Sequence, residues 1–199
     1  MNFKLSAKKT WATVAIAGVV GIGTTMVSGI VPSANLAQAA AAASSQNNED
    51  AAQALKTLNS FYKPALKGQF PGSVSELTVG KSTRKDVFKA IGEPSEERKN
   101  ASGYDVYGAE MGHPGYAFTY KSDKIREIRY FGTNIERQTN IGGITMSMLK
   151  KNWGAPNTTT TVKNGNSKQT KITYNRDKYK LEFIFNSSTD LDHINLLAK

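Results

Sequence analysis

The sequence predicts an α+β protein of two tandem lobes, each a short helix followed by a small antiparallel sheet. The hydrophobic period changes from helical to alternating after Pro94 and again after Pro156. The stretch TRKDVFKAIGEP at 83–94 also returns as TMSMLKKNWGAP at 145–156. At one offset of 62 residues, with no gap, the two stretches and the residues before them carry the same type of residue at six positions. The pairs are Gly80 and Gly142, Thr83 and Thr145, Val87 and Leu149, Ile91 and Trp153, Gly92 and Gly154, and Pro94 and Pro156. Helices segregated to one side of antiparallel sheets define the α+β class.

Residues 1–39 read as a secretory signal peptide. Three lysines (Lys4, Lys8 and Lys9) precede an uncharged stretch at 11–31, and Ala37-Gln38-Ala39 forms a small-x-small cleavage site. A retained membrane anchor is the alternative, because the uncharged stretch is long enough to span a bilayer. We expect a secreted or wall-associated protein with no integral membrane segment after cleavage.

Composition limits the chemistry of the mature chain. Cleavage after Ala39 would leave 160 of the 199 residues, enough for one domain or two small lobes. The chain has no cysteine, which excludes disulfides and thiol chemistry. Loss of three lysines would leave 23 basic and 16 acidic residues, a net charge of +7. Such a charge attracts polyanions such as teichoic acid or extracellular DNA, although it also serves solubility alone.

The first lobe is expected at 50–133, after a disordered tether at 40–49 that contains no large apolar residue. Helical spacing of apolar residues predicts an extra N-terminal helix at about 50–63, with Asn48 to Asp50 at its start. Pro64 interrupts this helix, a further turn can follow, and Gly68 ends it.

Each lobe then has its own helix and strands. Ser82 or Thr83 can cap the helix at 83–91, which Gly92 and Pro94 end. Alternating residues around Tyr104–Val106, Tyr116–Tyr120 and Ile128–Tyr130 predict an antiparallel meander. The second lobe, 134–199, repeats this plan with strands in TTTTVK, KQTKITYN, KYKLEFIF and HINLL.

Three stretches resemble the YjgB-like secreted proteins of Bacillus, whose domain has no known function. They are KGQFPGSVSELTVGKSTRKDVFKAIGEP, YAFTYKSDKIREIRYF and the second helix ending in Gly-Ala-Pro. The resemblance covers about residues 50–160 and brings no catalytic residues. A Gram-positive source is expected on a separate ground, because secreted chains without cysteine are common in Gram-positive bacteria. More distantly, the repeated unit is similar to the repeats of the β-lactamase inhibitor protein and of small outer-membrane assembly lipoproteins, which are binding proteins. The absence of cysteine departs from those proteins, so β-lactamase inhibition is only an analogy.

Motifs for catalysis, cofactors or metals are absent from the sequence, so we expect no enzyme, no cofactor and no metal site. His113 lies in a turn-like MGHPG stretch. His193 follows Asp192 on a strand, where neighbouring side chains should point to opposite faces. A hydrolase with an unrecognised site stays open as an alternative and needs Asp105, Glu110 or His113 to converge in a cleft.

Aromatic and basic residues of the first sheet make the candidate binding surface. Their alternation favours a role in the core, but tyrosines beside cations can also contact a partner protein or a glycan. The candidate residues are Tyr104, Tyr107, Tyr116, Tyr120, Lys124, Arg126 and Arg129. The leading hypothesis is a non-catalytic binding module for a secreted or surface protein or an envelope polymer, without specific nucleic-acid recognition. The alternative is polyanion binding by charge alone.

Overall fold

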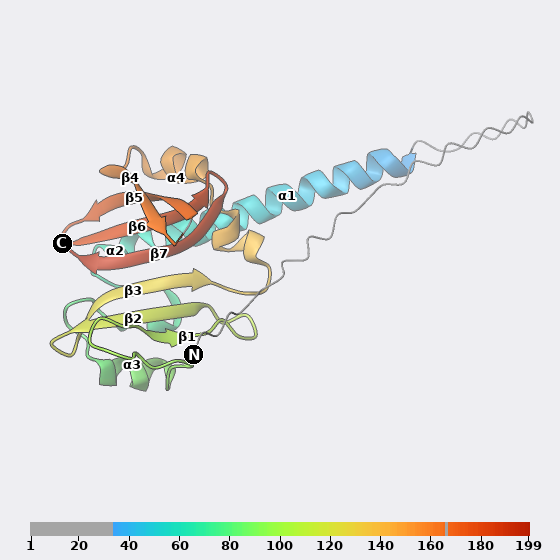
Figure 1. Cartoon of the computed structure of the whole chain (residues 1–199). Helices are drawn as coiled ribbons and strands as arrows, with labels where there is room; N and C mark the ends of the chain where they lie inside the picture. The colour runs from blue at the N-terminus through green and yellow to red at the C-terminus, as the bar shows by residue number, and fades with distance from the viewer. Residues whose placement is uncertain (1–33, 166) are drawn as a thin grey trace, which may run out of the picture.

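A seven-stranded antiparallel sheet organises residues 34–165 and 167–199, the part of the chain that the computed structural model describes (Figure 1). Its strand order is β1-β2-β3-β7-β6-β5-β4. The strands are β1 (Asp105–Tyr107), β2 (Gly115–Lys121), β3 (Lys124–Gly132), β4 (Thr158–Asn164), β5 (Ser167–Arg176), β6 (Tyr179–Ser187) and β7 (Asp190–Ala198). The helices are α1 (Ala34–Ser60), α2 (Tyr62–Ala65), α3 (Arg84–Ile91) and α4 (Met146–Trp153), with 3-10 turns η1 (Gly72–Val74), η2 (Arg137–Thr139) and η3 (Ile141–Gly143).

The pairing of β3 with β7 joins the two predicted sheets into one. Ile128 lies opposite Leu196, and Tyr130 lies opposite Ile194. Two separate small sheets would have left both strands as unpaired edges, so their union satisfies main-chain groups that would otherwise face water. The α+β class is confirmed, but the division into two lobes is not, because a single buried cluster takes residues from both halves.

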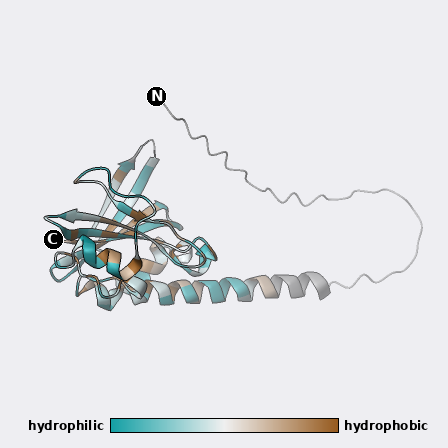
Figure 2. Cartoon of the chain, turned by 90° about the horizontal axis from the view of Figure 1, so that it is seen from below, coloured by the Kyte–Doolittle hydropathy of each residue, from teal (hydrophilic) through white to brown (hydrophobic). Residues whose placement is uncertain are grey.

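Helix α1 starts earlier than the sequence indicated. It begins at Ala34, so residues 40–49, for which we expected a disordered tether, are helical. Alanine, the strongest helix former, occupies residues 39–43 and favours extension of the helix backwards from its packed end. Ala54 and Leu58 are fully buried, whereas the preceding turns project past the body (Figures 1 and 2). The signal-peptide prediction falls mainly on residues 1–33, outside the described residues.

Pro64 lies within the short helix α2, the further turn that the sequence indicated. The chain then turns at Gly68, which has a φ of 74°. Together α1 and α2 place Phe61 in the core, where its ring meets those of Phe70 and Tyr130 edge to face at 5.2 and 5.0 Å. Among the described helices, none is long and apolar enough to cross a membrane.

The two short helices begin and end alike. Thr83 caps α3 by accepting a hydrogen bond from the Asp86 amide, and Thr145 caps α4 by accepting one from the Met148 amide. Gly92 and Gly154 end them with φ near 80° and ψ near −165°, a conformation that favours glycine. The predicted caps and ends of both helices are therefore confirmed.

Candidate ligand-binding groove

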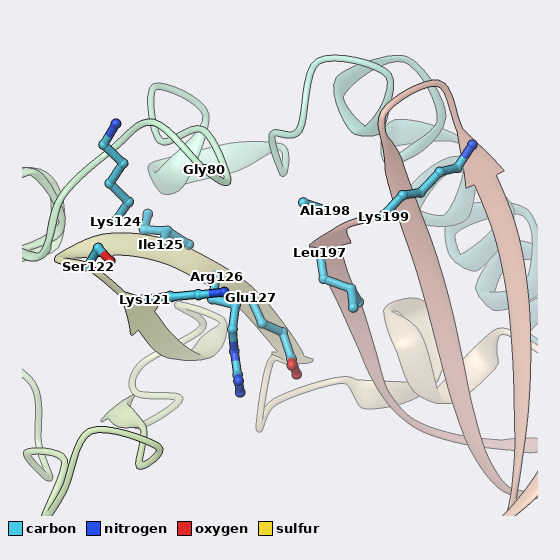
Figure 3. A pocket seen from close by; sticks show the side chains of 10 residues that line it. All are labelled: Gly80, Lys121, Ser122, Lys124, Ile125, Arg126, Glu127, Leu197, Ala198 and Lys199. Atoms are coloured by element: carbon cyan, nitrogen blue, oxygen red, sulfur yellow. The ribbon is translucent and has the colours of Figure 1, made fainter.

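A groove of about 530 Å³ lies where β3 and β7 separate at one end of the sheet (Figure 3). It is lined by Gly80, Lys121, Ser122, Lys124, Ile125, Arg126, Glu127, Leu197, Ala198 and Lys199, and we call it the basic groove. Pairing between β3 and β7 covers only Glu127–Tyr130 and Ile194–Leu197, so the first residues of β3 diverge from β7.

Two local features build the groove. A tight turn at Ser122 and Asp123, both with positive φ, sets Lys121 and Lys124 side by side at the β2–β3 hairpin. On the other side, the Gly80 amide donates to the Ile125 carbonyl at 2.7 Å, and the Ile125 amide donates to the Ser82 carbonyl at 2.8 Å. The loop at 80–82 therefore takes the place beside β3 that β7 leaves.

The electrostatics of the groove are strongly positive. The exposed cations Lys121, Lys124, Arg126 and Lys199 form no ion pair with any carboxylate of the described residues. Glu127 is already engaged: its carboxylate accepts from Arg129 Nε at 2.7 Å and from the Tyr104 hydroxyl at 3.2 Å. In Figure 3, Lys124 and Lys199 point to one side of the sheet, and Arg126, Glu127 and Leu197 point to the other.

The basic surface continues into an adjoining hollow that shares Lys121, Ser122 and Arg126 with the groove. Arg98 lines this hollow, and its guanidinium lies 5.2 Å from the centre of the Tyr120 ring. Arg98 and Lys199 were missed by the sequence analysis. Only the pairing of β3 with β7 brings the end of the chain to the β2–β3 turn, and no local pattern predicts that pairing.

The predicted binding residues divide into two groups. Lys124 and Arg126 line the basic groove, and Tyr104 and Arg129 lie beside it. The Arg129 guanidinium stacks on the Tyr104 ring at 4.2 Å and donates to its hydroxyl at 2.6 Å. Burial raises the pKa of Tyr104, and the nearby Glu127 carboxylate adds to this effect.

The other predicted tyrosines are corrected to core residues, namely Tyr107, Tyr116 and Tyr120. Their side chains point to the face of the sheet that α1 and α2 cover, where they join the main hydrophobic cluster. Burial raises the pKa of each of the three hydroxyls. Alternation identified these residues as one face of a sheet, but it does not say which face the helices cover.

The residues named for a hydrolase do not gather in one cleft. Asp105 is completely buried and is held by Arg84, whereas Glu110 and His113 are exposed on the β1–β2 loop beside a different pocket. Residues 34–165 and 167–199 contain no group of three or more His, Cys, Asp or Glu side chains placed to hold a metal ion.

Asp192 and His193 contradict the expectation that strand neighbours point apart. Asp192 Oδ2 lies 2.6 Å from His193 Nδ1. His193 pairs with Ile184 and Leu191 with Phe185, so Asp192 has no partner opposite and forms a β-bulge. The extra residue lets both side chains meet, and the hydrogen bond to His193 lowers the pKa of Asp192.

Comparison with known proteins decides the family. The domain of unknown function DUF4309 matches residues 58–197. This chain belongs to the DUF4309 family. It is 40% identical over 157 residues to the uncharacterized protein YjgB of Bacillus subtilis strain 168, covering 78% of this chain and 80% of YjgB.

The crystal structure of YjgB agrees with this fold. It superposes with a TM-score of 0.67 at 38% identity and covers 74% of this chain and 99% of the YjgB chain. The family resemblance seen in the sequence is therefore confirmed. The more distant similarity to the β-lactamase inhibitor repeat is not shown by these comparisons and stays a prediction.

Proposed function

We propose that this protein is a secreted, non-catalytic binding module that holds an anionic polymer of the cell envelope in its basic groove. The single observation that carries the proposal is the set of four unpaired cations, Lys121, Lys124, Arg126 and Lys199, around one hollow. Unpaired surface cations in a concave site raise the local concentration of anionic ligands and favour their binding.

The floor of the groove adds a second contact. Ile125 is fully buried beneath the rim, and Leu197 and Ala198 supply apolar surface between the cations. A poly(polyol phosphate) chain can place its phosphates on the rim and the carbon atoms of its polyol units on this floor. Exported proteins meet such polymers in the wall, which agrees with the signal peptide that the sequence predicts.

Charge reversal in the groove tests the proposal. We expect Lys121→Glu/Arg126→Glu to weaken binding to purified poly(glycerol phosphate) teichoic acid by about tenfold or more. The matched control is Lys56→Glu/Lys168→Glu, which changes the net charge equally at exposed sites on α1 and at the far end of β5. Equal losses in the two variants would show that net charge alone, and not the groove, binds the polymer.

Salt dependence supplies an independent measurement. Four displaced counterions predict that the wild-type affinity falls on the order of 50-fold between about 50 and 200 mM salt, with a smaller fall for the groove variant. An acidic protein segment is the alternative ligand. Competition by polyglutamate as strong as that by teichoic acid would favour it over the polymer.

We also propose that the chain arose from two related helix–sheet units, of which α3 with β1–β3 and α4 with β4–β7 are the present forms. Support comes from the matching caps and glycine ends of the two helices. In addition, Tyr107 and Tyr174 each donate from the hydroxyl to the carbonyl of the glycine that ends the helix of their own unit, Gly92 and Gly154 respectively.

A further inference from the structure

A second hollow, with acidic instead of basic side chains in its lining, opens beside the C-terminal end of α3. It has a volume of about 450 Å³ and we call it the acidic pocket. Its lining residues are Ser73, Ala90, Ile91, Glu93, Ser95, Tyr107, Gly108, Glu110, His113, Pro114 and Tyr116. They come from η1, from α3 and the loop after it, and from the end of β1, the β1–β2 loop and the start of β2, so the fold brings three separate segments to one site.

The charges of the acidic pocket oppose those of the rest of the chain. The whole sequence carries a net charge of +10, yet neither lysine nor arginine lines this hollow. Its carboxylates belong to Glu93 and Glu110, and neither forms an ion pair with a described residue. Glu93 and Tyr107 line the same pocket, and the pKa of Tyr107 is raised first by burial and then by the Asp105 and Glu93 charges.

One polar group in the lining also lacks a partner. The Tyr116 hydroxyl is buried, and it makes no hydrogen bond of good geometry with any described residue. Burial raises the pKa of Tyr116 to about 12, and the neighbouring Ser73 hydroxyl partly offsets this. By contrast, the Tyr107 hydroxyl donates to the Gly92 carbonyl. The Ser95 hydroxyl donates to the Val106 carbonyl and accepts from the Gly108 amide. A buried hydroxyl without a hydrogen-bond partner is uncommon, and a bound ligand could supply the missing partner.

We propose that the acidic pocket binds a ligand that carries a protonated primary amine. An ammonium group has three donors, and the two carboxylates and the Tyr116 oxygen supply acceptors. Ala90, Ile91 and Pro114 provide apolar wall for the carbon atoms next to the amine. A divalent metal fits less well, because the described residues hold no set of three metal-ligating side chains here or elsewhere.

Two sources share this chemistry, an amino sugar and an aminoacyl group. The test titrates the full-length protein with glucosamine and with alaninamide, and follows the backbone amide shifts of Ser73, Glu93, Gly108 and Glu110 by NMR. At about pH 6.5 an amine with a pKa near 8 is protonated. We expect saturable shifts at about 1–10 mM ligand for at least one probe. The better probe identifies the source.

Acetylation of the amine is the first control. N-acetylglucosamine and N-acetylalaninamide keep the carbon skeleton but lose the charge, so we expect them to bind at least about tenfold more weakly. Equal binding of the acetylated probe would overturn the proposal, because the pocket would then recognise the skeleton and not the amine. Tighter binding of calcium ions than of either amine at the same residues would also overturn it.

Variants separate the site from the general surface. Glu93→Gln/Glu110→Gln preserves shape and removes both charges, and we expect about a tenfold loss of amine affinity. Glu49→Gln/Glu76→Gln makes the same change in charge at exposed positions elsewhere and should bind like the wild type. Tyr116→Phe should weaken binding with little loss of stability, since its hydroxyl makes no hydrogen bond of good geometry and has only the Ser73 hydroxyl beside it. Equal affinities in the two glutamine variants would refute the site. The basic groove plays no part in these measurements, so the outcome is independent of the proposed function.

Discussion

The guanidinium of Arg84 donates two hydrogen bonds to the carboxylate of Asp105, from Nε at 2.7 Å and from Nη2 at 2.9 Å. Asp105 is wholly buried, and the side chain of Arg84 is 25% exposed. Burial alone would raise the pKa of Asp105, but the hydrogen bonds from Arg84 and from the Arg98 amide outweigh it and lower the pKa. This pair ties α3 to the edge strand β1, which has only three residues of its own.

Asp105→Asn should destabilise the protein by about 2–4 kcal/mol, because it removes the buried carboxylate of the pair and leaves Arg84 with only the exposed Glu97 carboxylate, at 3.1 Å, as an ionic partner. Urea denaturation of the variant measures the free energy of unfolding. Asp123→Asn is a suitable control, since Asp123 is exposed and asparagine tolerates its positive φ. If both variants unfold at the same urea concentration as the wild type, the Arg84–Asp105 pair does not contribute to the free energy of unfolding.

The same pair predicts an acid-dependent loss of stability. The folded pKa of Asp105 is lower than its value in the unfolded chain, so the unfolded chain binds more protons as the pH falls. The stabilisation is therefore complete above the unfolded pKa of about 3.9 and is lost as the pH falls through the folded value. The difference in unfolding free energy between wild type and Asp105→Asn should shrink between about pH 5 and pH 2. A constant difference over this range would contradict the assignment.

Arg176 presents the opposite situation, a buried cation without a carboxylate partner among the described residues. Its guanidinium lies 4.5 Å from the ring centre of Tyr62, 4.8 Å from that of Trp153 and 5.2 Å from that of Tyr174. Its Nε and Nη2 atoms have no hydrogen-bond partner, and burial lowers the pKa of the group. The rings bring α2, α4 and β5 together around this side chain.

We expect packing, and not charge, to dominate at Arg176. Arg176→Ala should cost about 2–4 kcal/mol because it opens a cavity between three elements. Arg176→Met should recover most of that loss, since a long apolar side chain fills the space without a desolvated charge. Thermal and urea unfolding of both variants give the comparison. If methionine proves as damaging as alanine, the cation–ring attraction is the larger contribution.

A close approach between α1 and η3 gives a third structural prediction. A Cβ atom on Gly143 would overlap the Gln138 carbonyl and would come within 2.7 Å of Ala54 Cβ. Gly143→Ala should therefore cost about 2 kcal/mol or more, because backbone must move to relieve the overlap. Gly108→Ala is the matched control, as its Cβ would meet only Ser95 Oγ at 3.8 Å and its φ is not positive. Similar melting temperatures for the two variants would show that the η2–η3 segment adapts freely.

Sequence reasoning succeeded where the causes are local. The caps Thr83 and Thr145 and the terminating residues Gly92 and Gly154 follow from rules that act within one turn of helix. It failed where distant segments decide the outcome. Alternation in β2 places Tyr116 and Tyr120 on one face, but only the docking of α1 and α2 makes that face the core.

The candidate site shows the same limit. The cations at Lys124 and Arg126 could be named from the sequence because they accompany the predicted hairpin. Lys199 joins them only because β7 pairs with β3, across more than sixty residues of sequence. The meeting of Asp192 and His193 likewise depends on a bulge that is set by pairing with β6. Register between strands is a property of the whole sheet, so a single sequence does not reveal it.

Tyr107 and Tyr174 test the proposed relationship between the two helix–sheet units. Each hydroxyl donates to the carbonyl of the glycine that ends the short helix, Gly92 at 3.2 Å and Gly154 at 2.9 Å. Tyr107→Phe and Tyr174→Phe should each cost about 0.5–1.5 kcal/mol, because water can reach the exposed glycine and partly replace the lost bond.

The double variant should show the sum of the two losses, as the bonds lie in separate units and share no partner. Tyr116→Phe provides the control, since its hydroxyl makes no hydrogen bond of good geometry and has only the Ser73 hydroxyl beside it, so its removal should leave the urea midpoint nearly unchanged. A loss in only one of Tyr107→Phe and Tyr174→Phe would mean that one unit no longer uses the bond to hold its helix. A loss in both would show that each unit holds the end of its helix by the same hydrogen bond, which supports a common origin.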